Sequence, residues 1–399
     1  MASPSLRAAT ARRVDTPTDR GPLLLISSDF PPVPGGQSRY LFDLWSQLPQ
    51  AEVLVLAPQL EGDAGVDAGL DCRVERLPLP LGHSRLAKIG KALLLARAAW
   101  RLCRQHRVRA VHCGQVLSAG IAGLACRLLC GVPYSVYVYG ADMLEFYRRP
   151  LWGTVLRKVL RHADRVFAIS QYTAQVAVRC GVKEDRIELV PPAIALERFS
   201  ALAGGPGWRT RHGWQEDLLL CSLGRLVERK GQDTVIKALP ALRRRWPNLR
   251  YVVGGEGPYR SVLEALAQRC GVAEAVHFVG FVPEEELPLV LAAADVFVMV
   301  SRQLDEVGEV EGFGIVYLEA NAAAVPVLAG RSGGAGDAVE DEVTGILVDP
   351  ESIEDVSGGL ERLLGDAGLR QRLGQAGQDR VRRDFDRRRR AERLWALCR

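Results

Sequence analysis

The sequence lacks the short motifs that identify several large classes of enzyme. It contains no Cys-x-x-Cys pair and no His-x-x-x-His spacing, so it gives no sign of a zinc site. Neither a complete G-x-G-x-x-G nor a G-x-x-x-x-G-K-[ST] motif occurs, which disfavours a dinucleotide oxidoreductase and a P-loop NTPase. The hydrophobic fraction of 48% and charged fraction of 25% are nevertheless those of a globular protein with a core.

Long apolar segments are also missing. No apolar run reaches the roughly 18 residues that a membrane-spanning helix needs, and no signal-peptide core is found near the N-terminus. We therefore expect a cytoplasmic protein, in which the arginine-rich residues 1–20 form a disordered tail. The nine cysteines are scattered. We expect buried free thiols, rather than a disulfide or metal site at Cys126 and Cys130.

Charge is distributed unevenly along the chain. Residues 1–200 carry 26 Lys and Arg against 17 Asp and Glu, whereas residues 201–399 carry 26 against 30. The excess is greatest between residues 84 and 161, where 14 basic residues accompany only Asp142 and Glu145. Within this stretch, residues 84–106 combine a helical apolar period with recurring basic residues. That pattern predicts a basic amphipathic helix.

Two series of alternating strands and helices follow one another. Strands are predicted at 23–27, 52–57, 110–112, 134–139, 165–169 and 187–190, and then at 218–223, 251–254, 276–279 and 296–300, with helices that include 38–48, 232–246 and 259–270. Pro191-Pro192 ends the first series, and residues 204–207 are predicted to be a linker. The alternation predicts two doubly wound parallel sheets. The Arg-rich segment 369–399 is predicted to be helical, with Asp384 and Asp386 in ion pairs along it.

The most informative segment is Glu311-Gly-Phe-Gly-Ile-Val-Tyr-Leu-Glu319. Its two carboxylates are eight residues apart, slightly more than two helical turns, so both fall on nearly the same side of the predicted helix. Small residues before a helix leave its first N–H groups free to bind an anion. The segment therefore suits a ligand that carries both phosphate and hydroxyl groups, and a nucleotide sugar is such a ligand.

A second glycine-bounded segment supplies cations. Gly224-Arg-Leu-Val-Glu-Arg-Lys-Gly231 follows a predicted strand and precedes a helix, which is where an open parallel sheet presents its ligands. Arg225 and Lys230 would place two positive charges beside a diphosphate, although a solvated basic loop is the alternative for this segment alone. Gly35-Gly36, after the first strand, would let backbone approach a phosphate from the other domain.

Together, Gly35-Gly36, Gly224-Arg225, Lys230-Gly231, Glu311-x7-Glu319 and Ser332-Gly-Gly334 resemble the family-four retaining glycosyltransferases of the GT-B fold, over roughly residues 22 to 395. Asp29-Phe-Pro-Pro and the segments 229–234 and 305–319 are most similar to the bacterial phosphatidylinositol-mannoside mannosyltransferases. The resemblance implies an α/β GT-B architecture with two Rossmann-like doubly wound domains facing across a cleft. An N-terminal acceptor-side domain would span 21–195 and a nucleotide-sugar-binding domain 208–375, with a C-terminal helix at 376–399 returning to the N-terminal domain.

The resemblance also implies roles for individual residues. Arg225 and Lys230 would neutralise the leaving diphosphate, Glu311 would bind hydroxyls of the transferred sugar, and Glu319 would bind the ribose. The implied donor-binding residues are Gly35, Gly36, Gly224, Arg225, Lys230, Val279, Gly280, Glu311, Gly312, Phe313, Gly314, Ile315 and Glu319, with the backbone at Val279-Gly280 receiving the base. No metal ion and no cofactor other than the nucleotide-sugar co-substrate is expected. Catalysis would rest on alignment and on stabilisation of leaving-group charge.

The sequence departs from the family pattern at the acceptor side. Relatives often carry a His-Gly pair that contacts the sugar, whereas this chain has Tyr139-Gly140-Ala141-Asp142. Tyr139 could still donate a hydrogen bond, so we count it as catalytic with Arg225, Lys230 and Glu311, and place Asp142 beside it on the acceptor side. Ala324 replaces a glycine that is common in the family.

The implied reaction is transfer of a hexose, most simply mannose from GDP-mannose, to a lipid or glycolipid acceptor. Basic residues 85–109 would then dock on the anionic inner membrane surface, each near-surface cation contributing about 1 kcal/mol; a solvated helix face is the alternative. Nucleic-acid binding is disfavoured because aromatic stacking residues do not recur among the charges; Trp100 is the one aromatic residue within 85–109. Other possibilities are a UDP-sugar-dependent transferase with a soluble or polysaccharide acceptor, a nucleotide-sugar epimerase of the same fold, and a sugar-binding protein without chemistry.

Overall fold

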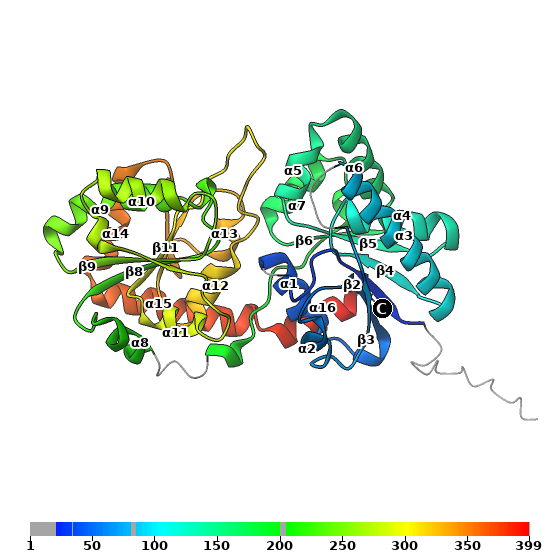
Figure 1. Cartoon of the computed structure of the whole chain (residues 1–399), viewed down its shortest axis with the longest axis horizontal. Helices are drawn as coiled ribbons and strands as arrows, with labels where there is room; N and C mark the ends of the chain where they lie inside the picture. The colour runs from blue at the N-terminus through cyan, green and yellow to red at the C-terminus, as the bar shows by residue number, and fades with distance from the viewer. Residues whose placement is uncertain (1–20, 34, 81–84, 200–204, 399) are drawn as a thin grey trace, which may run out of the picture.

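The computed structural model describes residues 21–33, 35–80, 85–199 and 205–398. The tail predicted for residues 1–20 lies outside these ranges. The chain forms two parallel β-sheets, each covered by helices on both faces (Figure 1). The two resulting α/β domains face one another, which confirms the predicted GT-B architecture.

The first sheet has seven strands in the order β3-β2-β1-β4-β5-β6-β7, and every pairing is parallel. Its buried central strands are almost wholly apolar, as expected for strands covered on both faces. The strands are β1 (Leu23–Ile26), β2 (Val53–Pro58), β3 (Arg73–Leu77), β4 (Ala110–Cys113), β5 (Tyr134–Val138), β6 (Arg165–Ala168) and β7 (Ile187–Leu189), and the helices are α1 (Gly36–Trp45), α2 (Asp63–Asp67), α3 (Arg85–His106), α4 (Ser118–Cys130), α5 (Ala141–Tyr147), α6 (Pro150–His162) and α7 (Gln171–Arg179).

The second sheet has six strands in the order β10-β9-β8-β11-β12-β13, again all parallel. In both sheets the order reverses next to the first strand, and such a switch point is where doubly wound sheets bind ligands. The elements are β8 (Leu218–Leu223), β9 (Leu249–Gly254), β10 (Val276–Gly280), β11 (Val296–Met299), β12 (Val327–Gly330) and β13 (Gly345–Val348), with α8 (Gly205–His212), α9 (Gln232–Arg245), α10 (Arg260–Arg269), α11 (Leu287–Ala293), α12 (Ile315–Ala322), α13 (Ala335–Ala338), α14 (Ile353–Gly365), α15 (Ala367–Asp384) and α16 (Arg387–Cys398).

Two sequence predictions were wrong. Residue 204 of the predicted linker lies outside the described residues, and residues 205–207 begin a helix instead. Gly205 opens α8 and packs so closely on α11 that a Cβ there would lie 2.7 Å from the Ala292 carbonyl oxygen. The predicted helix over 369–399 is broken between Asp384 and Arg387. Asp384 pairs with Arg383 at 2.8 Å, as predicted. Asp386 makes no ion pair with a described residue; its carboxylate accepts from the backbone N–H groups of Arg388 and Arg389, at 3.0 and 3.1 Å, and caps α16.

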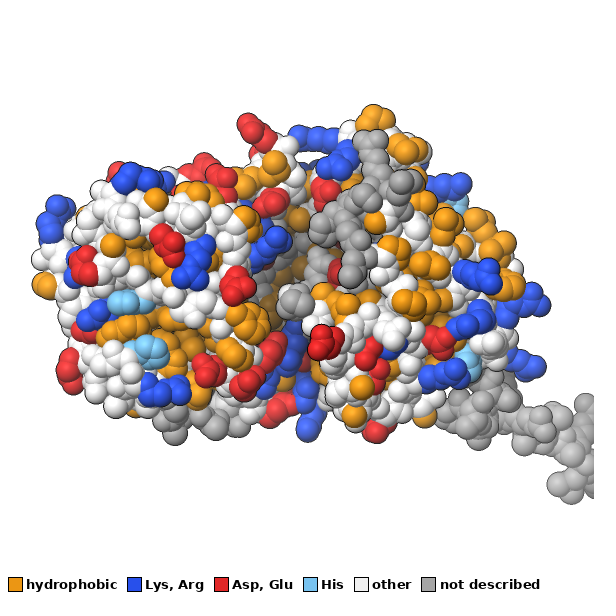
Figure 2. All heavy atoms as spheres, viewed as in Figure 1, with side chains coloured by type: hydrophobic (Ala, Val, Ile, Leu, Met, Phe, Trp, Pro, Cys, Tyr) orange, Lys and Arg blue, Asp and Glu red, His pale blue; other side chains and the backbone are white. Residues whose placement is uncertain are grey.

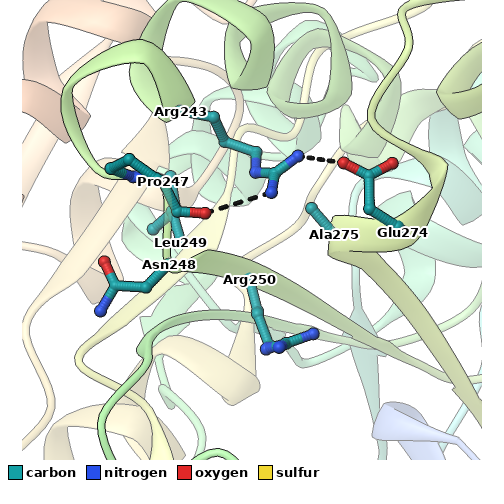
Figure 3. Close-up of a pocket in the computed structure, with 7 residues that line it drawn as sticks. All are labelled: Arg243, Pro247, Asn248, Leu249, Arg250, Glu274 and Ala275. Atoms are coloured by element: carbon teal, nitrogen blue, oxygen red, sulfur yellow. Dashed lines mark hydrogen bonds and ion pairs between the residues drawn. The ribbon is translucent and has the colours of Figure 1, made fainter.

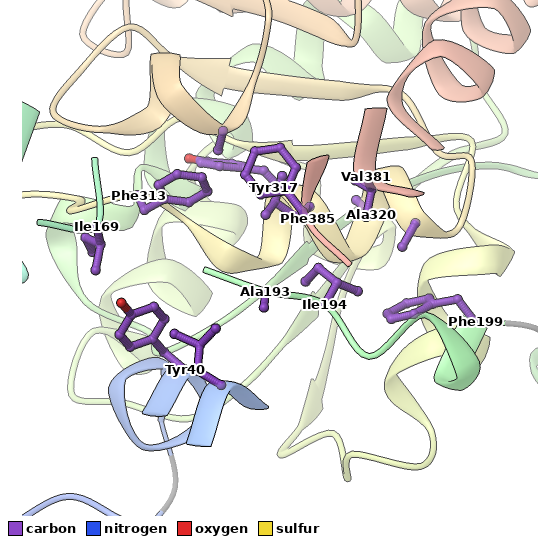
Figure 4. Packing of buried hydrophobic residues seen from close by; sticks show 14 of the residues in the cluster. Tyr40, Ile169, Ala193, Ile194, Phe199, Phe313, Tyr317, Ala320, Val381 and Phe385 are labelled. Atoms are coloured by element: carbon purple, nitrogen blue, oxygen red, sulfur yellow. The ribbon is translucent and has the colours of Figure 1, made fainter. Parts of the chain in front are cut away.

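The chain crosses between the two sheets twice. The first crossing follows β7, and the second is the break between α15 and α16, where the Ile194 N–H donates to the Phe385 carbonyl at 2.7 Å. After the break, α16 packs against α1 (Figure 1). Buried side chains from both domains, among them Tyr40, Ile194, Phe313 and Phe385, form one hydrophobic cluster around these crossings (Figure 4).

No helix among the described residues combines the length and the apolar character needed to cross a bilayer.

Candidate active site

Two helix N-termini meet between the domains. α1 begins at Gly36 and α12 at Ile315, and the Ile315 Cδ1 atom lies 3.6 Å from the position of a Cβ on Gly36. The N-cap residues are Gly35 and Gly314, with φ of 134° and 89°, and neither position has a side chain that caps the helix. The first N–H groups and the positive dipole ends of both helices are therefore available to an anion. Figure 2 shows a groove between the domains with basic side chains along it.

Glu311 and Lys230 form a buried ion pair beside these helix ends. The Lys230 Nζ atom is 2.5 Å from Glu311 Oε2, and the two residues are only 8% and 9% exposed. Arg229 Nη1 reaches the same carboxylate oxygen at 3.1 Å. Burial lowers the pKa of Lys230. Burial also opposes ionisation of Glu311, but Lys230 and Arg229 outweigh it and hold the pKa of Glu311 below its usual value.

The structure separates the two cations predicted for the diphosphate. Lys230 is buried on Glu311, whereas Arg225 is exposed and lines a cavity of about 390 Å³ between the domains, together with Ala141, Glu145, Arg149, Val227, Arg229, Val307, Gly308 and Glu309. Arg229 was missed by the sequence analysis. Its position in the sequence, directly before Lys230, could have indicated a role, because both residues lie in the one-turn helix Glu228–Lys230.

Backbone packs on backbone around Gly312. A Cβ on Gly312 would lie 2.1 Å from the Tyr139 carbonyl oxygen of the other domain, and a Cβ on Gly334 would lie 2.0 Å from the Gly312 carbonyl oxygen. The Ser170 hydroxyl donates to the same Gly312 carbonyl oxygen at 2.7 Å, and the Gly334 N–H donates to the backbone carbonyl oxygen of Glu311 at 2.8 Å. Ser332-Gly-Gly334 therefore supports the Glu311–Gly312 backbone. Residues 330–334 also fit the G-x-S-x-G pattern, but here the glycines serve close packing.

Other contacts hold the domains together on the same side. The Gln171 N–H donates to Asp337 Oδ1 at 2.9 Å, and the Tyr172 hydroxyl donates to Gln303 Oε1 at 2.8 Å. Both donors lie at the start of α7 in the first domain, and both acceptors belong to the second. These contacts join the two domains along one side of the cleft.

Tyr139 and Asp142 lie at the carboxyl end of β5, on the first domain's side of the cleft. The Tyr139 ring is buried edge-on against Tyr40, with ring centroids 5.8 Å apart, and its hydroxyl has no hydrogen-bond partner among the described residues. Asp142 Oδ1 accepts from the Tyr139 N–H at 3.0 Å. Burial raises the pKa of Asp142 to about 6. Asp142 thus fixes the loop that carries Tyr139, but the Tyr139 hydroxyl is itself buried in the hydrophobic cluster and does not face the cleft in this structure.

The predicted nucleoside-binding residues lie on α12 and at the end of β10. Glu319 is 9% exposed, and its Oε1 atom is 3.4 Å from Arg198 Nη1. Gly280 has a φ of 73°, and its carbonyl accepts from the Gly255 N–H at 2.6 Å, so the end of β10 is fixed against the residue that follows β9. Phe313 is buried against Phe385, with ring centroids 6.0 Å apart, and so anchors its segment rather than facing the cleft.

A second hollow of about 280 Å³ lies elsewhere, between Arg243 and Glu274 and around Leu249 and Ala275 (Figure 3). Leu249 begins β9 and Ala275 precedes β10, so this hollow lies at the amino ends of the strands, opposite to the cleft. It has no part in the site. Within the described ranges, no cluster of three or more His, Cys, Asp or Glu side chains could hold a metal ion.

Two facing doubly wound domains define the GT-B class of transferase fold. The chain belongs to the glycosyltransferases: residues 34–198 match Glycosyltransferase Family 4, and residues 207–380 match Glycosyl transferases group 1. This membership confirms the predicted family and enzyme class.

Relatives cover nearly the whole chain. It is 35% identical over 361 residues to a GDP-mannose-dependent alpha-(1-6)-phosphatidylinositol monomannoside mannosyltransferase of Mycolicibacterium smegmatis, covering 89% of this chain and 92% of the relative. It is 32% identical over 376 residues to the enzyme of Corynebacterium glutamicum named for the monoacylated form of that acceptor, covering 91% and 93%.

Solved structures share the fold. Anabaena HepE in complex with UDP and glucose superposes with a TM-score of 0.80 at 19% identity, covering 95% of this chain and 99% of that one. The sucrose-phosphate synthase of Thermosynechococcus elongatus gives a TM-score of 0.80 at 23% identity, covering 95% and 98%. At these identities the likeness concerns the fold alone.

Proposed function

We propose that the protein transfers mannose from GDP-mannose to a phosphatidylinositol-based glycolipid, with retention and without a metal ion. The buried Lys230–Glu311 pair beside the two facing helix N-termini carries the proposal, because it joins a hydroxyl-binding carboxylate to cations and N–H groups that suit a diphosphate. The names of the relatives supply the donor and the acceptor class.

The proposed chemistry needs few groups. The bond between the sugar C1 and the diphosphate oxygen breaks, the acceptor hydroxyl oxygen bonds to C1 on the same face, and the departing phosphate takes the acceptor's proton. Lys230, Arg229 and the N–H groups of α1 and α12 stabilise the charge that develops on the diphosphate. Glu311 orients the sugar by accepting hydrogen bonds from its hydroxyls. Closure at Gly312 excludes water and aligns donor with acceptor.

A donor screen tests the proposal. Thermal unfolding is measured with GDP-, UDP- and ADP-sugars, and transfer of labelled sugar to a phosphatidylinositol-mannoside extract is followed without and with EDTA. We expect GDP-mannose alone to stabilise the protein strongly and to be turned over in EDTA. Stabilisation by a UDP-sugar instead would overturn GDP-mannose as the donor. Inhibition by EDTA that Mg²⁺ reverses would overturn a metal-free reaction. An epimerised donor without transfer would overturn the assignment as a transferase.

We also propose that an exposed apolar patch on α3 meets the membrane. In the first half of α3, Ile89, Leu93 and Leu94 are 46%, 64% and 39% exposed. Lys91, between them, is close enough to Asp29 at the end of β1 to oppose the rise in the pKa of Asp29 that burial causes. We infer that this α3 patch (Ile89, Leu93 and Leu94) contacts the tails of the lipid acceptor, since it lies on the helix whose Lys91 is near the loop after β1.

Co-sedimentation with anionic vesicles tests the patch. We expect Leu93→Ser to weaken sedimentation and the reaction with membrane-borne acceptor. Leu129→Ser is the matched control, because Leu129 is 69% exposed at the far end of α4. Docking through α3 would be contradicted if both variants lost vesicle binding equally. It would also be contradicted if the Leu93→Ser variant still bound vesicles at high salt.

A further inference from the structure

Arg198 links the nucleoside side of the cleft to the segment that joins the domains. It lies in the one-turn helix Leu196–Phe199, shortly before the second sheet begins. Its Nη1 atom is 3.4 Å from Glu319 Oε1, and its Nη2 atom is 3.0 Å from Glu284 Oε2. The Arg198 side chain is only 17% exposed, so these contacts fix its guanidinium in a planar fork between two carboxylates.

The same carboxylate also reaches the first domain. Glu284 Oε2 is 2.6 Å from Arg39 Nη1, and Arg39 Nε is 2.8 Å from Asp43 Oδ2. Arg39 and Asp43 both lie on α1, the helix whose N-terminus faces the diphosphate site. Charges therefore alternate without a break from Asp43 through Arg39, Glu284 and Arg198 to Glu319, and the series runs from the first domain to the predicted ribose carboxylate.

Glu319 depends on this series for its charge. Burial raises the pKa of Glu319, the Glu284 and Asp43 carboxylates raise it further, and Arg198 and Arg39 oppose the rise. Without Arg198, the Glu319 carboxylate, which is 9% exposed, would face the Glu284 and Asp43 carboxylates with less positive charge to balance them. A neutral or displaced Glu319 would accept hydrogen bonds from a ribose less well.

We propose that Arg198 is a positioning residue for donor binding, which holds the Glu319 carboxylate in place for the ribose hydroxyls and, through Glu284 and Arg39, couples it to α1. The inference rests on the proposed function for the identity of the nucleotide. Arg198 acts through Glu319 and does not touch the reacting atoms, so its removal weakens donor binding more than it slows the chemical step.

Calorimetric titration with GDP and 2′,3′-dideoxy-GDP tests the proposal in the wild type, Glu319→Gln and Arg198→Ala. Hydrogen bonds to a charged group contribute about 1.5–3 kcal/mol, so we expect the wild type to bind the dideoxy nucleotide roughly 10- to 100-fold more weakly. Both variants should reduce this ratio to a few-fold. Arg198→Lys, which keeps the charge but loses the fork, should give an intermediate ratio and covers the case in which Arg198→Ala does not fold.

Arg165→Ala is the control, because Arg165 pairs with Glu188 at 3.8 Å on the surface away from this series. It should keep the wild-type ratio. If the Arg198 variants bind both nucleotides more weakly by the same factor, Arg198 has only a general structural role and the proposal fails. If the wild type binds UDP and not GDP, the proposed donor fails, and the same ratio measured with UDP and dideoxy-UDP still decides the role of Arg198.

Discussion

Lys230 Nζ and Glu311 Oε2 are 2.5 Å apart inside the cleft, with Arg229 on the same oxygen. The pair connects the loop after β8 to the loop before α12. A group that is buried this deeply without a partner is costly, so each side chain keeps the other charged in the absence of substrate. The pair thus holds both side chains in one arrangement, as the proposed donor site requires.

Removing one charge of this pair should damage both stability and activity. We expect Glu311→Gln to lower kcat/KM by at least 100-fold and the unfolding free energy by about 3 kcal/mol, because Lys230 is left buried with less compensation. The double variant Lys230→Met with Glu311→Gln should recover much of the stability but none of the activity. Urea unfolding and transfer assays measure the two effects.

The exposed pair Arg260–Glu264 provides the control for that experiment, with side chains 43% and 44% exposed. Arg260→Met with Glu264→Gln should change stability by less than about 1 kcal/mol and leave transfer intact. Full activity in Glu311→Gln would show that Glu311 does not bind the transferred sugar.

A methyl group at Gly312 should keep the cleft from closing. Its Cβ would lie 2.1 Å from the Tyr139 carbonyl oxygen, so we expect Gly312→Ala to leave each domain folded but to abolish transfer and increase the radius of gyration in small-angle scattering. Gly358→Ala adds the same methyl group within α14 where no atom lies within 4 Å. That variant should stay active, and unchanged scattering in Gly312→Ala would contradict the proposed block.

Asp142 should make stability depend on pH. Burial raises its pKa from 3.8 to about 6, so between these values the folded protein keeps a proton that the unfolded chain has lost. The resulting stabilisation is full below pH 3.8 and is lost as pH rises through about 6. From pH 4.5 to 7.5 we expect the wild type to lose about 2 kcal/mol relative to Asp142→Asn. Parallel urea titrations that show no difference would exclude a raised pKa.

Ala324 should be a site where glycine is better than alanine. Its φ is 58°, a left-handed conformation that costs a non-glycine residue roughly 1–2 kcal/mol, part of which the flexibility of glycine in the unfolded chain offsets. We expect Ala324→Gly to raise the unfolding free energy by about 0.5–1 kcal/mol. Ala396→Gly, on the exposed face of α16, should lower it by about 1 kcal/mol. Destabilisation by Ala324→Gly would contradict the strain.

Much of the fold could be predicted from the sequence because its central strands are continuous apolar runs, such as Leu218–Leu223. The missed strands were β3, β12 and β13. Three of the five residues of β3, an edge strand of the first sheet, are charged, and β12 and β13 each have a glycine among four residues. Charged residues and glycine are depleted in strands, so these segments lack the composition by which the other strands were recognised.

The candidate site was predictable where its residues are close together in sequence, as at Glu311–Glu319. Arg198 and Tyr172 could not be found, because their partners in the second domain lie 121 and 131 residues away and no local spacing records such contacts. The separation of Arg225 from Lys230 could not be predicted either. The one-turn helix Glu228–Lys230 directs Lys230 into the interior and leaves Arg225 in solvent.

The position of α16 has a consequence for how the protein is made. Leu394 and Trp395 of this helix are buried in the same cluster as Leu44 and Trp45 of α1, yet a ribosome synthesises them only after the whole second sheet. While the chain is growing, the first domain therefore carries an uncovered apolar face, and nascent chains are open to chaperones or to aggregation there until the last helix emerges. Premature termination within α16 would leave that face permanently bare, even though every proposed active-site residue had already been made.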